Sequence, residues 1–180
     1  MNGLRTRLRP LDALAPSDIA AWESLACDAP AGIPALLPGM VQAAARWLTP
    51  DDPPVVLSVE RGGELLALTC LQRRAPDLFV PLPHWRAYRH PHAFQSGILH
   101  RSGEAPAVAE AIAGLMRRGS WRERAIRWHC VAADSDMWKA LRGAAAPPWM
   151  QTLALHGALP IWLPGVVPVA GRSNVQNPRM

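Results

Sequence analysis

The stretch VVLSVERGGELLALTCLQRR (55–74) decides the fold class. Its two arms are rich in apolar and β-branched residues, and they flank the pair Gly62-Gly63. Glycine adopts the positive φ angles that tight turns between strands require. The stretch therefore predicts two antiparallel strands, 55–60 and 64–74, joined by a tight turn.

Three elements are predicted upstream of this hairpin. The alternating residues LRTRLR (4–9) are typical of a short strand. A helix follows, with Ser17 or Asp18 as its cap and apolar residues at helical spacing. MVQAAARWL (40–48) predicts a second helix, which ends before Pro50.

Five elements are predicted downstream. DLFVPL (77–82) and FQSGIL (94–99) are expected to be short strands. An amphipathic helix is expected over 103–118, a buried strand over 124–132 and a capped helix over 134–146. The whole order predicts an α/β fold with a mixed, mostly antiparallel sheet flanked by helices.

Length and composition narrow the classes of protein. The chain of 180 residues suits one domain, and its net charge of +5 comes from scattered arginines. A nucleic-acid binder usually carries a basic stripe, so no nucleic-acid partner is expected. The sequence has no apolar run long enough to span a membrane and no apolar segment typical of a secretory signal. Three widely spaced cysteines indicate reduced thiols and predict a cytoplasmic protein.

The stretch PLPHWRAYRHPHAFQSGILH (81–100) holds four of the six histidines. It contains no Asp, Glu or Cys that would complete a zinc site, so no metal site is expected. Structural histidines and a substrate-facing loop remain as the two interpretations. In the second, His90 and His92 are the candidate catalytic residues, because imidazole titrates near neutral pH. The pair His129-Cys130 lies on a predicted buried strand and is expected in the core. It is not expected to form a nucleophilic Cys/His pair, because neighbours on a strand point to opposite faces.

Four segments carry a resemblance to a known family. They are AWESLACDAPAGIPALLPGMVQAAARWL (21–48), the hairpin 55–74, HPHAFQSGILH (90–100) and IRWHCVAADSDMWKALRGAA (126–145). Over residues 8–146 the chain resembles the N-terminal half of the CelD/BcsL-type acetyltransferases, in the FemAB-like part of the GNAT superfamily. GNAT domains run β-α-α-β-β-β-α-β-α before two closing strands, which agrees with the predicted order.

The resemblance implies an acyl-CoA-dependent acyltransferase of polysaccharide or cell-envelope biosynthesis. The acceptor would be a small molecule or glycan, whose amine or hydroxyl attacks the acetyl-CoA or other acyl-CoA thioester directly. Such a reaction needs a held thioester, N–H donors for the oxyanion and removal of a proton. The alternative is a non-catalytic binding or interaction module on the same scaffold.

The resemblance also implies a cofactor loop of the pattern Arg/Gln-x-x-Gly-x-Gly/Ala at the start of a helix, where backbone N–H groups bind the pyrophosphate. The corresponding segment is SGILHRSGEAPA (96–107). Gly97, Arg101 and Gly103 are the candidate cofactor-binding residues, but the two glycines depart from the family spacing. The CoA site is therefore expected in a missing C-terminal half of the same protein, and this chain alone is expected to be inactive.

Residues 1–148 are expected to form this degenerate GNAT-like domain, truncated at its C-terminus, and 149–180 an irregular tail. Within the tail, the residues at 158–161 (ALPI) back-translate as GCT CTT CCG ATC, followed by the T of the Trp162 codon. That string matches the end of a common sequencing adapter. The hypothesis is that the natural sequence stops near residue 150 and that the rest is a chimera, which the genomic reading frame decides.

Overall fold

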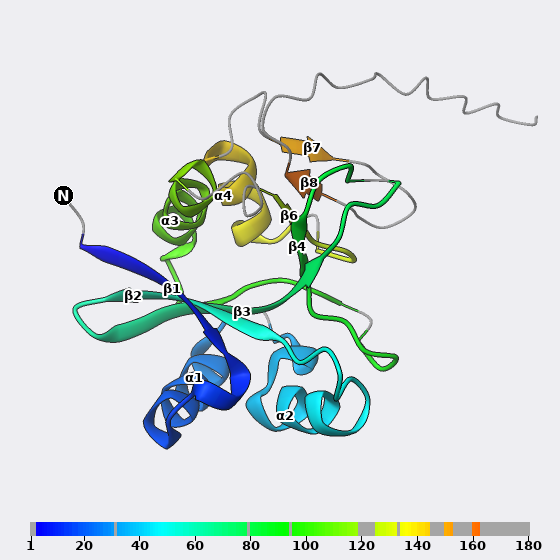
Figure 1. Cartoon of the computed structure of the whole chain (residues 1–180). Coiled ribbons are helices and arrows are strands. Elements are labelled where there is room, and N and C mark those ends of the chain that lie inside the picture. The colour runs from blue at the N-terminus through cyan, green and yellow to red at the C-terminus, as the bar shows by residue number, and fades with distance from the viewer. Residues whose placement is uncertain are drawn as a thin grey trace, which may run out of the picture.

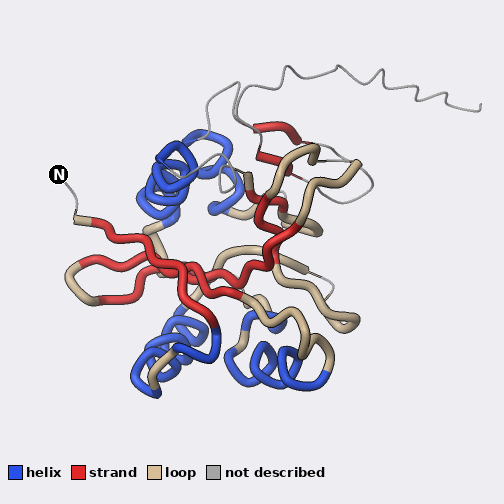
Figure 2. Tube along the Cα trace, in the orientation of Figure 1, coloured by secondary structure: helices blue, strands red, loops and turns tan. Residues whose placement is uncertain are grey.

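The computed structural model is an α/β fold in three layers. It describes residues 3–30, 32–78, 80–93, 95–118, 125–132 and 134–144, and the backbone of 150–152 and 160–162. One mixed sheet forms the middle layer, with α1 and α2 on one side and α3 and α4 on the other (Figures 1 and 2). The predicted α/β class with a mostly antiparallel sheet is confirmed.

The strands are β1 (Leu4–Pro10), β2 (Val55–Arg61), β3 (Glu64–Arg74), β4 (His84–Ala87), β5 (Leu99–His100), β6 (Ile126–Arg127), β7 (Met150–Thr152) and β8 (Pro160–Trp162). Their order in the sheet is β1-β2-β3-β4-β6-β8-β7, and β5 pairs with β3. Every pair is antiparallel except β4 with β6, which are parallel.

The helices are α1 (Pro16–Asp28), α2 (Pro38–Trp47), α3 (Ala105–Arg118) and α4 (Asp136–Ala144), with short 3-10 turns at Leu11–Ala13 and Pro34–Leu36. In α1 the chain enters the helix at Pro16, and Asp18 lies inside the first turn instead of capping it. The Asp18 carboxylate accepts a hydrogen bond from the N–H of Ala15 at 2.9 Å and binds Arg9 at 2.7 and 2.9 Å. The cap predicted for the helix at 134–146 is confirmed in α4, where the Ser135 hydroxyl accepts from the N–H of Trp138 at 3.2 Å. None of the helices in the described residues is long and apolar enough to cross a membrane.

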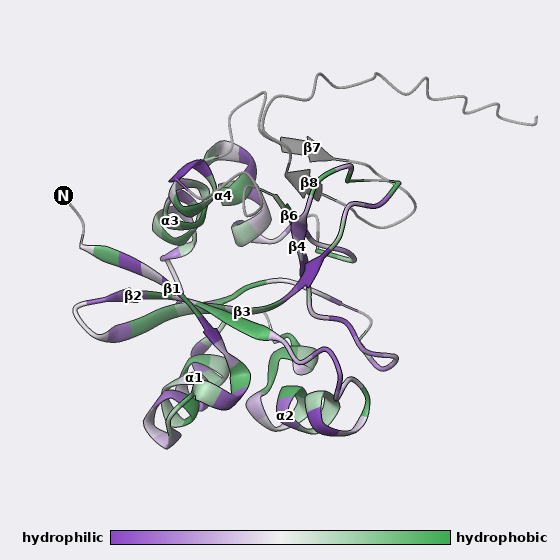
Figure 3. Cartoon of the chain, viewed as in Figure 1, coloured by the Kyte–Doolittle hydropathy of each residue, from purple (hydrophilic) through white to green (hydrophobic). Residues whose placement is uncertain are grey.

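The hairpin of β2 and β3 is confirmed as predicted. Gly62 and Gly63 have φ angles of 59° and 90°, and the register pairs Arg61 with Glu64 across the turn. Both turn residues thus lie in the left-handed region, which only glycine enters without strain. Most of β3 is buried, and Figure 3 shows it in the hydrophobic colour.

Two hydrophobic cores lie on opposite faces of the sheet. Leu57 and Leu71 pack with Ile112 of α3 on one face. Val56 and Leu68 pack with Trp22 of α1 on the other. This alternation along β2 and β3 follows from the two-residue period of a strand, and it explains why neighbouring residues such as Val56 and Leu57 are both apolar.

Three predicted strands differ from the structure. The described residues of 77–82, which are 77, 78 and 80–82, contain no strand, and β4 begins at His84, where the chain pairs with the end of β3. The strand expected over 94–99 is reduced to Leu99–His100, and that expected over 124–132 to Ile126–Arg127. The tail expected to be irregular contains β7 and β8; its other residues, including 158 and 159, lie outside the described part.

Candidate functional site

The two parallel strands of the sheet meet only briefly. In the register of β4 and β6, Trp85 lies opposite Ile126 and Arg86 opposite Arg127, and the pairing ends there. Cys130 then has a φ of 50°, a left-handed angle that is uncommon for a residue with a side chain. Residues 128–132 therefore leave the direction of β6 and do not continue the pairing with β4.

The strand on the other side of this junction is broken. β4 pairs with Leu71–Arg74 of β3, and β5 pairs with Ala67 and Leu68 further back along the same strand. β4 and β5 are thus two parts of one strand, interrupted by residues 88–98. We call this interruption the β4–β5 loop; it contains His90 and His92.

The β4–β5 loop is fixed at both ends. At its start the hydroxyl groups of Tyr88 and Thr49 share a hydrogen bond of 2.9 Å. Near its end the Thr69 hydroxyl donates to the carbonyl of Gly97 at 2.7 Å. A Cβ atom on Gly97 would lie 2.7 Å from Cδ1 of Ile33, so this position needs glycine for the close approach of the loop between α1 and α2.

One serine side chain joins the loop to the segment after β6. The Ser96 hydroxyl donates to the carbonyl oxygen of His129 and accepts from the N–H of His129 at 3.0 Å. Ser96 and His129 are both buried. The parallel pairing with β4 has ended before His129. The Ser96 hydroxyl therefore forms the two backbone hydrogen bonds of His129 that a neighbouring strand would otherwise form.

A small, mostly apolar cavity lies between the β4–β5 loop, the segment 128–132 and α4. Its volume is about 30 Å³, enough for about two water molecules. Trp128 and Trp138 contribute the largest side chains to its wall, and Ser96 and His100 are among its polar residues. The complete lining is Ile33, Gln95, Ser96, Gly97, Ile98, His100, Trp128, Val131, Ala132, Ser135, Met137, Trp138 and Leu141.

The two candidate catalytic histidines have different environments. His90 is buried; its Nδ1 accepts from the N–H of His92 at 3.3 Å, and its Nε2 is buried without a partner. Burial lowers the pKa of His90, and the neighbouring His92 lowers it further. His92 is exposed, with its ring centroid 6.3 Å from that of His90. Neither lines the cavity, so the structure does not bring this pair together with Ser96 and Trp128.

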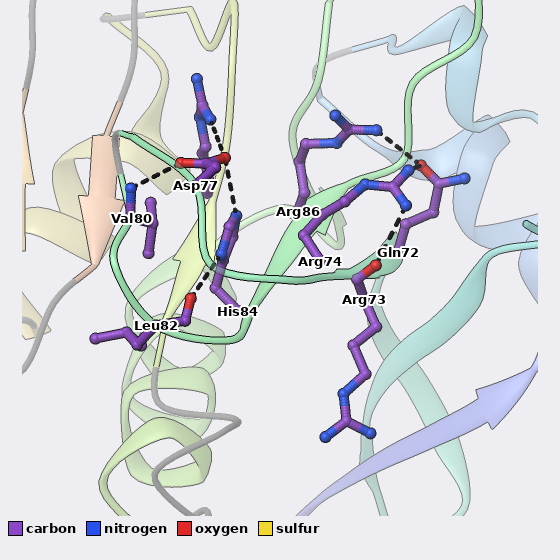
Figure 4. Close-up of polar contacts among 9 residues, drawn as sticks. Gln72, Arg73, Arg74, Asp77, Val80, Leu82, His84 and Arg86 are labelled. Atoms are coloured by element: carbon purple, nitrogen blue, oxygen red, sulfur yellow. Dashed lines mark hydrogen bonds and ion pairs between the residues drawn. The ribbon is translucent and has the colours of Figure 1, made fainter.

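The other two histidines of the stretch 81–100, His84 and His100, lie within hydrogen-bond distance of backbone carbonyl groups. The Nδ1 atom of His84 lies 3.0 Å from the carbonyl of Leu82, and its Nε2 lies 3.9 Å from the Asp77 carboxylate (Figure 4). The Nδ1 atom of His100 lies 3.0 Å from the carbonyl of Arg101. Among the described residues, no three His, Cys, Asp or Glu side chains are grouped so that they could hold a metal ion.

His129 is the titratable residue that stands out in the structure. Its side chain is 8 % exposed, and its Nε2 is buried without a hydrogen-bond partner. Burial, together with the charges of Arg89, Arg86 and Arg127, lowers the pKa of His129 to about 4. The ring is therefore neutral at pH 7 and becomes protonated only in acid. The sequence predicted that His129 and Cys130 both lie in the core; His129 is buried as predicted, whereas Cys130 is exposed, because the chain leaves the strand direction there.

The expected cofactor loop is occupied by ion pairs. Arg101 binds Asp28 at 2.7 Å and Glu64 at 2.9 Å. Glu104, just before α3, binds Arg61 through both carboxylate oxygens at 2.8 and 2.9 Å. Gly103 has a φ of 77° and forms the turn into α3, whereas Gly97 lies in the β4–β5 loop. The three candidate cofactor residues thus do not converge on one point, and the guanidinium of Arg101 already has two carboxylate partners.

Comparison with protein-family models, curated proteins and solved structures finds no match for this chain. Its chemistry is therefore inferred from the site itself. The region contains a separated strand pair, a narrow apolar cavity and a neutral buried imidazole. The imidazole belongs to His129, which does not line the cavity itself but follows Trp128, which does.

Proposed function

We propose that this chain is an acyltransferase scaffold of the GNAT type, in which an acceptor amine or hydroxyl attacks an acyl-CoA thioester. The observation that carries the proposal is the order of the elements. The chain runs β1-α1-α2-β2-β3-β4/β5-α3-β6-α4-β7-β8, with β4 and β5 counted as one broken strand. This parallels the GNAT order named above, including its two closing strands.

The junction of β4 and β6 supports the same proposal. Acyl transfer needs a cleft in which a thioester lies extended, with backbone N–H groups near its carbonyl oxygen. The parallel strands separate beyond Arg86 and Arg127, and the apolar cavity lies in the region of that separation. Displacement of the Ser96 hydroxyl from His129 would free one N–H and one carbonyl for such a ligand.

His129 is our candidate for the general base. It is neutral at pH 7 and its Nε2 has no partner, so it can take up the acceptor's proton as the N–C or O–C bond forms, although a pKa of about 4 makes it a weak base. The acyl group then leaves CoA, whose thiolate takes up a proton from solvent. His90 has a lowered pKa as well. Neither histidine lines the cavity, but the backbone of His129 is hydrogen-bonded to Ser96, which does.

The donor phosphates have two candidate places. One is the start of α3, where His100-x-x-Gly103-x-Ala105 has the spacing of the family loop with His in place of Arg or Gln. The ion pair with Arg61 offsets the negative charge of Glu104 at this helix terminus. The other is a second half of the protein outside this chain, in which case the chain presents the acceptor side to a CoA-bearing partner.

Titration with acetyl-CoA, followed by tryptophan fluorescence, tests the proposal, because Trp128 and Trp138 line the cavity. Saturable quenching below millimolar cofactor supports donor binding at this site. A Trp138→Phe variant should lose part of the signal, whereas Trp47→Phe, at an exposed position of α2, should retain it. Absence of any response up to millimolar acetyl-CoA would exclude donor binding by this chain and leave only the acceptor-side version.

A non-catalytic binding module is the second candidate, and the size of the cavity favours it. About 30 Å³ accommodates no part of a cofactor arm without movement of the β4–β5 loop. A transfer assay with acetyl-CoA and a panel of amines and sugars separates the two candidates. Release of free CoA that depends on both acceptor and His129 supports the enzyme, and ligand binding without turnover supports the module.

A further inference from the structure

A cluster of arginines occupies the polar end of the sheet. Gln72 of β3, Arg86 of β4 and Arg127 of β6 lie side by side in register across three strands. Residues directly opposite one another point to the same face, and Arg74 shares that face because it is two residues from Gln72. Figure 3 shows β4 in the hydrophilic colour, next to the hydrophobic β3.

Arg74 and Arg86 share one hydrogen-bond acceptor. The side-chain carbonyl of Gln72 accepts from Nη2 of Arg74 at 2.7 Å and from Nη2 of Arg86 at 3.3 Å. Figure 4 shows both guanidinium groups directed toward Gln72, while Arg73 points away from them. The Nε atom of Arg86 is buried and has no partner. Two like charges thus meet at a single neutral oxygen.

The cluster holds more positive than negative charge. Arg74 is paired with Asp52 at 2.5 Å and Arg127 with Asp77 at 3.1 Å. Neither Arg86 nor Arg89 has a carboxylate partner in the described part of the chain. Burial lowers the pKa of Arg86, and Arg74, Arg127 and Arg89 lower it further, against the opposing effect of Asp52.

His129 connects this cluster to the candidate site. The positive charges of Arg86, Arg89 and Arg127 lower the pKa of His129. Its Nε2 atom is buried and has no hydrogen-bond partner. The start of α3, which is the candidate place for the donor phosphates, is at a different position on the sheet from the arginine cluster. Arg86 is opposite Gln72 and His100 is opposite Ala67, five residues away on β3, which corresponds to roughly 17 Å.

We propose that Arg86 and Arg89 bind a compact oxyanion with two negative charges, such as a phosphate monoester, at the end of the sheet formed by β4 and β6, near His129. Guanidinium groups bind phosphate through paired hydrogen bonds, and the anion would offset the two charges that lack carboxylates. The acceptor of the proposed transfer reaction would then be a phosphorylated small molecule. The role of this molecule as the acceptor rests on the proposed function, whereas the binding of an anion by these arginines does not.

Calorimetric titration at low ionic strength, without any CoA, tests the site. Inorganic phosphate and a hexose phosphate are the probes, and the unphosphorylated hexose is the uncharged control. We expect saturable binding of both phosphates, and about tenfold to 100-fold weaker binding in Arg86→Gln and in Arg89→Gln. Arg73→Gln is the matched control, because Arg73 lies one residue from Arg74 but points away from the cluster.

A second readout is the titration of His129 by NMR. A bound anion offsets the arginine charges that disfavour its protonation, so phosphate should raise the pKa of His129 above its value of about 4. Tighter binding of the hexose phosphate than of free phosphate would identify a phosphorylated acceptor, and equal binding a simple phosphate site. Absence of phosphate binding, or unchanged binding in a folded Arg89→Gln variant, would overturn the proposal whatever the result with acetyl-CoA.

Discussion

Ser96 and His129 are joined through a single hydroxyl group, which donates to the carbonyl and accepts from the N–H of the same residue. This is an unusual way to end a strand pairing, because both backbone groups of one residue depend on one side chain. It ties the β4–β5 loop to the segment that carries the candidate base. The position of His129 is therefore coupled to the loop.

The Ser96→Ala variant should lose about 1–3 kcal/mol in the free energy of unfolding, because it leaves two buried backbone groups without a partner. Urea denaturation of the two proteins measures the difference. Ser102→Ala removes a hydroxyl from the exposed turn before α3 and serves as the control. Equal stability of Ser96→Ala and the wild type would show that water replaces the hydroxyl.

The pKa of His129 predicts a specific loss of stability in acid. Its folded value of about 4 lies below the ordinary 6.5, so the unfolded chain binds the proton more readily. The free energy of unfolding should therefore fall as the pH drops from about 6.5 toward about 4, with at most about 3 kcal/mol from this residue. Denaturation of His129→Gln across this range should show a shallower slope than His92→Gln, whose ring is exposed. Identical slopes would contradict the assignment.

The ion pair of Arg61 with Glu104 predicts that the Glu104 carboxyl group stays ionised to a lower pH than an ordinary glutamate. The Arg61 guanidinium, by its hydrogen bonds and charge, holds the pKa of Glu104 below its ordinary 4.5. The pair thus stabilises the fold above that pH, and the contribution disappears as the pH falls through the folded value. In Arg61→Gln, NMR titration should show the pKa of Glu104 higher than in the wild type. Arg117→Gln, near the other end of α3, should leave it unchanged.

Gly97 and Ile33 should show strong energetic coupling. Gly97→Ala places a methyl group 2.7 Å from Cδ1 of Ile33, which must move. We expect a cost of about 1–3 kcal/mol, typical of overpacking. Ile33→Val removes Cδ1, so the same Gly97→Ala change should cost at least about 1 kcal/mol less in that background. An additive double-mutant cycle would show that the contact does not limit the loop.

Local patterns were sufficient for much of the fold. The hairpin 55–74 combines apolar arms with two glycines, and both strands lie where that pattern placed them. Helix α3 begins at Ala105, within two residues of the prediction, because its apolar spacing and terminal arginines agree. In these segments the local preference and the tertiary contacts favour the same structure.

The site depended on contacts between distant segments, which no local pattern encodes. Residues 124–132 are apolar enough for a strand, but β4 offers only two of them a partner. Arg101 resembled a phosphate ligand until the fold placed Asp28, 73 positions earlier in the chain, beside it. The arginine cluster was equally hidden, because its members come from three strands and one loop.

The broken strand has a consequence for engineering. Because β3 holds β4 and β5 independently, the ladder does not rely on the chain that connects them. Residues 89–95 lie between two fixed points, the Tyr88 hydroxyl and the Ser96 hydroxyl. Within this segment, the exposed residues Pro91 and His92 are the expected insertion point for a foreign peptide, because neither belongs to the paired strands.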